Sequence, residues 1–141
     1  MKKILIINSN YYKSISNNLV INAKKKLILE KYSVHKLDIP GVFEITISIR
    51  KNIKKYDGFV ALGCVLKGQT PHFDLICSST FNAILKLSID FNKPIGNGII
   101  TALNMNQAII RRKKNSINKP NKGSEAASAV ISILKNGPKN I

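Results

Sequence analysis

The most constraining feature of the chain is a continuous apolar run, Phe59 to Leu66, that stops abruptly at a polar turn. A strand buried on both faces of a parallel sheet has such a run, rather than an alternation of apolar and polar residues. The residues that follow, Lys67 to Pro71, therefore occupy the carboxyl end of a buried strand. Because open α/β sheets bind ligands at that end of their strands, we expect the chemistry of the chain there.

Strand and helix patterns alternate along the whole chain, which predicts one α/β domain, residues 1–141, with a four-stranded parallel sheet covered by helices on both faces. The strands are expected at Lys3 to Ser9, Val34 to Asp38, Asp57 to Leu66 and Pro94 to Thr101. The helices are expected at Ser14 to Tyr32, from a Pro40-Gly41 turn through about Lys54, and at His72 to Phe91, Asn104 to Arg112 and Ser124 to about Asn136.

Apolar residues at helical spacing identify the helix faces that should be buried. In chain order these are Ile15, Leu19, Ala23 and Leu27; Ile45, Ile49 and Ile53; Phe73, Ile76, Ala83 and Leu87; and Ala127, Val130, Ile131 and Leu134. Ser14 is the expected N-cap of the first helix. A polar loop is expected from Lys113 to Gly123.

The chain is strongly basic, with 23 Lys and Arg against 7 Asp and Glu and a formal net charge of +16. Such a balance suits proteins that bind nucleic acid or an anionic membrane. However, Ile, Lys and Asn make up 59 of the 141 residues, which is the composition that AT-rich codons produce. The clusters Lys24 to Lys26 and Arg111 to Lys114 are not interleaved with aromatic residues for base stacking. We therefore expect neither nucleic acid nor a membrane as a partner.

Two features of the sequence lead us to expect a cytoplasmic protein. No apolar stretch approaches the ~20 residues of a membrane span, and the first residues lack the features of a signal peptide. Cys64 and Cys77 lie in apolar surroundings without a CxxC motif, so we expect reduced thiols and no metal site.

Three loops should converge at one edge of the predicted sheet, because parallel strands all point their carboxyl ends the same way. They are Ser9 to Lys13, Ile39 to Phe43 and Lys67 to Pro71, joined by Thr101 to Asn104. In the third loop, Thr70 offers a hydroxyl, and the free N–H groups of the helix start favour an anion such as phosphate. His72 could exchange protons there, although a capped helix with an incidental histidine is the alternative.

The other loops carry residues with two interpretations each. Phe43 could stack on a flat ring and Glu44 accept hydrogen bonds from it, or they could fill the core and satisfy a helix start. Tyr11 could be a second stacking surface, or it could pack against a neighbour. Arg111, with Lys122 in the turn before the last helix, could bind phosphate or neutralise a helix end.

Four strings give the chain a resemblance to the lumazine synthase family. They are PGVFE at 40–44, LGCVLKGQTPHFD at 62–74, QAIIR at 107–111 and NKGSEAA at 121–127. The resemblance implies a flavodoxin-like three-layer subunit. It also implies an enzyme of riboflavin biosynthesis that needs no metal or organic cofactor. Such an enzyme condenses 5-amino-6-(D-ribitylamino)uracil with 3,4-dihydroxy-2-butanone 4-phosphate to 6,7-dimethyl-8-ribityllumazine, and it releases phosphate and water.

The resemblance also implies roles for individual residues. The residues expected to hold the pyrimidine and its ribityl chain are Tyr11, Val42, Phe43, Glu44, Cys64, Val65 and Leu66, with Asn97 from an adjacent subunit. Those expected to hold the butanone phosphate are Gln69, Thr70 and Arg111, with Lys122 in support. His72 would move protons. Asn97 stands where many members have Phe, and Lys67 stands where Arg is common.

A homo-oligomer is expected, because the resemblance implies a site that two subunits complete. The chain begins directly at its first strand, and its Lys113 to Gly123 loop is a few residues longer than in shell-forming relatives, so a pentamer is favoured over an icosahedral shell. Two alternatives remain. One is a relative of the archaeal-type riboflavin synthase, which would not need the same butanone-phosphate site, and the other is a non-catalytic basic binding protein.

Overall fold

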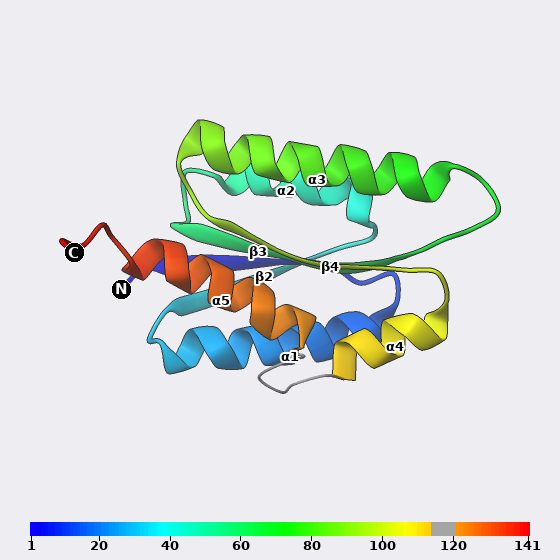
Figure 1. Ribbon diagram of the computed structural model, residues 1–141, viewed down its shortest axis with the longest axis horizontal. Helices are drawn as coiled ribbons and strands as arrows, with labels where there is room; N and C mark the ends of the chain where they lie inside the picture. The colour runs from blue at the N-terminus through cyan, green and yellow to red at the C-terminus, as the bar shows by residue number, and fades with distance from the viewer. Residues whose placement is uncertain (114–120) are drawn as a thin grey trace.

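The computed structural model describes residues 1–113 and 121–141 and shows a three-layer α/β sandwich (Figure 1). Its strands are β1 (Lys3–Ser9), β2 (Ser33–Ile39), β3 (Gly58–Leu66) and β4 (Ile95–Ala102). They form a parallel sheet in the order β2-β1-β3-β4. The expected fold class, a four-stranded parallel sheet between helical layers, is confirmed.

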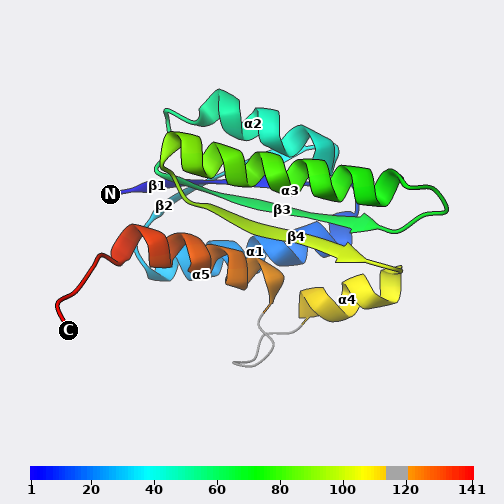
Figure 2. The same cartoon turned by 45° about the horizontal axis from the view of Figure 1, so that its top comes forward.

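The helices divide between the two faces of this sheet. They are α1 (Lys13–Leu29), the short 3₁₀ helix η1 (Val42–Glu44), α2 (Ile45–Asn52), α3 (His72–Phe91), α4 (Met105–Lys113) and α5 (Lys122–Lys135). α2 and α3 cover one face, and α1, α4 and α5 cover the other (Figures 1 and 2). No helix in the described part of the chain is long and apolar enough to cross a membrane.

β3 lies inside the sheet, with β1 on one side and β4 on the other. Its first seven residues are buried, and burial ends only at Val65 and Leu66, which are half-buried. The strand therefore has the two-sided burial that its apolar run predicts. Because all four strands are parallel, their carboxyl ends lie at one edge, where the connecting loops gather (Figure 1).

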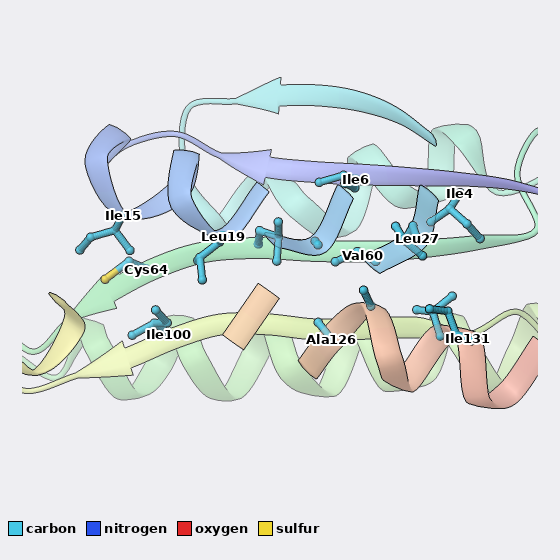
Figure 3. Close-up of a cluster of buried hydrophobic side chains, with 14 of the residues drawn as sticks. Ile4, Ile6, Ile15, Leu19, Leu27, Val60, Cys64, Ile100, Ala126 and Ile131 are labelled. Carbon is cyan, nitrogen blue, oxygen red and sulfur yellow. The ribbon is translucent and has the colours of Figure 1, made fainter. Parts of the chain in front are cut away.

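Each face of the sheet has its own apolar core. On one face, Ile4, Ile6 and Val60 pack against residues of α1 and α5, which include Ile15, Leu19, Leu27, Ala126 and Ile131 (Figure 3). On the other face, Leu5, Ile7, Phe59 and Ala61 pack against Ile45, Ile49 and Ile53 of the α2 segment. The expected buried faces of the first two helices are confirmed. Of the four residues expected to be buried in α5, Leu134 alone is only partly buried.

The expected inward face of α3 is partly wrong. Phe73, Ile76, Ala83 and Leu87 are only half-buried, and the buried positions are Thr80 and Ile84. Leu75, Leu85 and Ile89 on the same helix are exposed. Because α3 carries apolar residues around most of its circumference, spacing alone does not select the face that meets the sheet.

Two helix starts also differ from expectation. α1 begins at Lys13, and Ser14 is not its N-cap: that position is held by Tyr12, whose side chain makes no capping bond. α5 begins at Lys122, two residues early, because the Asn121 side chain accepts hydrogen bonds from the backbone N–H groups of Gly123 and Ser124. α1 ends at Leu29, three residues before the expected Tyr32, and the other boundaries agree or shift by one or two residues. Most of the expected polar loop, residues 114–120, lies outside the described residues.

Two glycines let α5 approach its neighbours closely. A Cβ atom on Gly96 of β4 would overlap the carbonyl oxygen of Ala126, and one on Gly123 would overlap the carbonyl oxygen of Leu19 in α1. Both obstacles are backbone atoms of packed helices, so they cannot move aside cheaply. The packing of α5 against β4 and α1 therefore depends on glycine at positions 96 and 123.

We predict that Gly96→Ala lowers the free energy of unfolding by about 1–3 kcal/mol, the range that overpacking of a core costs. Urea denaturation measures the change. Gly137→Ala is the matched control, because no atom lies within 4 Å of the added Cβ there, and it should stay within about 0.5 kcal/mol of the parent. Equal stability of the two variants would contradict the close approach of α5 to β4.

Candidate functional site

A pocket of about 570 Å³ opens at the carboxyl edge of the sheet. Four segments far apart in the sequence form its wall. They contribute Ser9, Tyr11 and Tyr12 after β1; Gly41, Val42, Phe43 and Glu44 around η1; Cys64, Val65 and Leu66 at the end of β3; and His72 and Ile76 of α3. The expected meeting of the segments Ser9 to Lys13 and Ile39 to Phe43 with the end of β3 is thus confirmed, whereas no residue of Lys67 to Pro71 or of Thr101 to Asn104 lines this pocket.

The outer wall of the pocket is aromatic. Tyr11 is 74% exposed and Phe43 is 66% exposed, so both rings offer a face to a ligand. Tyr11 is held edge-to-face against Tyr12, with ring centroids 4.9 Å apart. The Glu44 carboxylate lies close to Gly41 at the same wall. Two exposed aromatic rings beside a carboxylate can hold a flat ring that carries N–H donors.

The floor of the pocket is apolar and uncharged at neutral pH. Cys64 is buried there, and its burial raises the pKa of the thiol from 9.0 to about 11. Tyr12, half-buried, has a pKa raised above 10.0, first by burial and then by the nearness of Cys64 and Tyr11. Both groups therefore stay protonated, and neither supplies a nucleophilic anion near neutral pH.

His72 is the first residue of α3 and an exposed residue of the pocket wall. Its backbone N–H donates to the Thr70 hydroxyl at 3.4 Å, so the loop folds back on the helix start. The residue is thus in contact with both the pocket and water. His72, the residue expected to move protons, therefore lies in the same pocket as Tyr11 and Phe43.

The remaining expected site residues do not line the pocket of the single chain. Gln69 and Thr70 are exposed on the loop between β3 and α3, which extends beyond the sheet (Figure 1). The Arg111 guanidinium donates to the carbonyl oxygen of Thr101, and the Lys122 ammonium lies 3.7 Å from the Glu125 carboxylate. Asn97 pairs with Ala61 within the sheet, and its side chain accepts from the backbone N–H of Ile99 at 3.1 Å.

The structure thus separates the expected site into two groups. Seven residues assigned to the pyrimidine meet with His72 in one pocket, whereas the four assigned to the phosphate, and Asn97, lie outside it. Within residues 1–113 and 121–141, no three His, Cys, Asp or Glu side chains gather as metal ligands.

Four pocket residues were not expected from the sequence: Ser9, Tyr12, Gly41 and Ile76. A signal for Ser9 existed, since it is the last residue of its strand and therefore lies at the ligand edge. Tyr12 is adjacent to Tyr11 and has the same side chain, so the sequence alone does not show that both line the pocket. Ile76 lies one helical turn after His72, which spacing along α3 could have revealed.

Comparison with known proteins gives consistent matches over most of the chain. The family model described as 6,7-dimethyl-8-ribityllumazine synthase matches residues 1–136. A protein of that name from Bartonella tribocorum is 36% identical over 135 residues, which cover 94% of this chain and 89% of the relative. One from Novosphingobium aromaticivorans is 35% identical over 136 residues and covers 95% of both chains.

We predict that Cys64 is alkylated slowly at pH 8, because a pKa near 11 instead of 9.0 leaves about 100-fold less thiolate. The rate should keep rising with pH up to about 11. By the same linkage, any stability tied to this thiol is complete below its unfolded pKa and is lost as the pH rises toward the folded value.

Iodoacetamide labelling of the Cys77→Ser variant, followed by mass spectrometry, measures Cys64 alone. The same variant in 8 M urea is the control, and it should react at the rate of an ordinary thiol. A labelling rate in the folded protein that levels off near pH 9 would show that the thiol is not buried as described.

Proposed function

The chain belongs to the 6,7-dimethyl-8-ribityllumazine synthase family and is a transferase of riboflavin biosynthesis, and we propose that the pocket at the carboxyl edge of its sheet is the site of the reaction. The reaction condenses 5-amino-6-(D-ribitylamino)uracil with 3,4-dihydroxy-2-butanone 4-phosphate. The observation that carries the proposal is the meeting of Tyr11, Phe43, Glu44 and His72 in one pocket.

The pyrimidine is proposed to lie between the two exposed rings. Tyr11 and Phe43 would stack on its faces, and Glu44 would accept hydrogen bonds from the ring or from the ribityl hydroxyls. Val42, Cys64, Val65 and Leu66 would form the apolar floor beneath it. An apolar pocket with a few polar groups is the usual design for holding a small molecule in one orientation.

His72 is proposed to move the protons of the reaction. The pyrimidine amine adds to the ketone and water leaves as the Schiff base forms, phosphate is then eliminated, and ring closure releases a second water. Each step transfers a proton to or from nitrogen or oxygen. An exposed imidazole at the rim can exchange those protons with water, which supports this role for His72.

The butanone phosphate is proposed to bind at Gln69, Thr70 and Arg111, with Lys122 in support. Thr70 lies beside the start of α3, where backbone N–H groups favour an anion. Arg111 contacts the end of β4, so it lies at the carboxyl edge that also forms the pocket. These groups would have to turn from their present partners toward the phosphate, and its charge favours that change.

We further propose that the site is completed by a second subunit and that the chain forms a pentamer. Two features support an assembly. Asn97 and the residues proposed to bind the phosphate lie outside the pocket of one chain. The helix α3 also exposes Leu75, Leu85 and Ile89. Exposed apolar residues on one helix suit contact with another protein surface. We propose a cytoplasmic location, which suits the free thiols of Cys64 and Cys77.

We predict that the purified protein forms the fluorescent lumazine from the two substrates and that His72→Ala lowers kcat by about 10²-fold, the low end of what general acid–base catalysis contributes. Activity should remain, because aligning two bound substrates supplies most of the acceleration and water can replace an exposed imidazole. Steady-state fluorescence measures both KM values and kcat.

Two variants accompany this assay. His35→Ala removes the other histidine, which lies on β2 bonded to Tyr56, and it should leave kcat unchanged. Arg111→Ala should raise the KM for the butanone phosphate and leave that for the pyrimidine nearly unchanged. A wild-type protein that consumes the lumazine instead of forming it would refute the proposal, and complete inactivity of a folded, substrate-binding His72→Ala would refute the role given to His72.

We predict that Leu85→Asp on the exposed face of α3 dissociates the assembly and removes activity with it. Sedimentation of the protein, with the assay repeated on the same fractions, measures both. Asn82→Asp introduces the same charge at an exposed polar position of α3 and should keep both assembly and activity. A fully active monomer would contradict a site shared between subunits.

A further inference from the structure

Ser9 is the most deeply buried polar residue of the pocket wall. It ends β1, only 2% of its surface is exposed, and it lines the pocket together with Tyr11 and Val42. None of the roles given above uses it.

The Ser9 hydroxyl has no hydrogen-bond partner among residues 1–113 and 121–141. Among the described residues, three buried side-chain atoms lack one, namely Asn8 Oδ1, Ser9 Oγ and Arg112 Nε, and Ser9 alone of the three residues lines the pocket. An unsatisfied buried hydroxyl is unfavourable, and most such groups in folded proteins are paired. A polar group left without a partner inside a ligand pocket is therefore a place where the ligand can supply one.

The surroundings of Ser9 keep this position narrow. Gly63 on β3 lies beside it, and a Cβ atom at Gly63 would come within 2.9 Å of the Ser9 Cβ and 3.0 Å of a Val42 methyl group. The missing side chain thus leaves room for Ser9 and Val42 side by side. Rotation about the Cα–Cβ bond of Ser9 moves the hydroxyl among three staggered positions, so the hydroxyl can take a new partner without a move of the backbone.

We propose that the Ser9 hydroxyl is a further substrate-binding group, which hydrogen-bonds a polar atom at the edge of the bound pyrimidine ring. The proposal rests on the function proposed for the pocket. It assigns Ser9 to the pyrimidine and not to the butanone phosphate, because Ser9 lies with Tyr11, Val42 and Phe43, whereas Thr70 and Arg111 lie outside the pocket. Ser9 would then distinguish a ring with polar edge atoms from an apolar ring of the same shape.

The test compares Ser9→Ala with the parent in three measurements. In Ser9→Ala, the Kd of 6,7-dimethyl-8-ribityllumazine, followed by its fluorescence, and the KM of the pyrimidine should each rise about 5- to 10-fold, the effect of one lost hydrogen bond. The KM of the butanone phosphate should change less than about 2-fold. The melting temperature of the free protein should not fall, since the variant removes an unpaired group.

Two further variants make the result specific. Ser9→Cys has the same shape and a slightly larger side chain, but its thiol is a weak hydrogen-bonding group, so it should weaken product binding as Ser9→Ala does. Ser16→Ala is the matched control: Ser16 is equally buried, but its hydroxyl donates to the Lys13 carbonyl oxygen at 3.4 Å and lies outside the pocket. It should lower the melting temperature and leave product binding unchanged.

Unchanged product binding and pyrimidine KM in Ser9→Ala would overturn the proposal. So would a loss of melting temperature as large as that of Ser16→Ala, because the hydroxyl would then have a partner in the free protein. These outcomes leave the wild-type synthase activity intact, so they are distinguishable from failure of the proposed function. A wild-type protein that makes no lumazine would overturn both.

Discussion

Burial of β3 on both faces is the constraint on which the rest of the molecule depends. A strand with its first seven residues buried needs a neighbouring strand on each side and a helical layer above and below. The layers in turn require right-handed crossovers, which bring every loop after a strand to one edge. The strand leaves the core at Val65 and Leu66, and there the buried sheet becomes the floor of a pocket. The burial of β3 thus determines both where the pocket lies and how the core is built.

Much of this arrangement follows from local sequence. The run Phe59 to Leu66 predicts the central strand, and Ile15 to Leu27 at intervals of four predicts the buried face of α1. Prediction fails at the start of one helix and at the buried face of another. The start of α5 depends on the Asn121 side chain, and the orientation of α3 depends on which of its several apolar faces meets the sheet. Neither choice is encoded in spacing alone.

The site shows the same division. The meeting of Tyr11, Phe43, Glu44 and His72 in one pocket could be predicted because each stands next to a strand end or a turn, and the topology alone brings strand ends together. The strand end places Ser9 at the ligand edge, but the hydrogen bond that its hydroxyl lacks has no sequence pattern. The phosphate residues resemble the family in sequence, yet Arg111 and Lys122 contact Thr101 and Glu125 in the single chain. The resemblance indicates which residues to expect at the site, but it does not show which partners their side chains contact in the single chain.

Two features of the free pocket favour the binding of a flat ring with polar edge atoms. Tyr11 and Phe43 leave large apolar surfaces in water, and the Ser9 hydroxyl is buried without a partner. The exposed rings contribute little burial to the fold, and the unpaired hydroxyl opposes folding. A bound ring that covers the aromatics and pairs with the hydroxyl would be favoured on both counts, so part of the affinity for a pyrimidine bound as proposed would come from these groups. Any ligand that binds only the folded state stabilises it by mass action, so stability and substrate recognition are coupled through the same three residues.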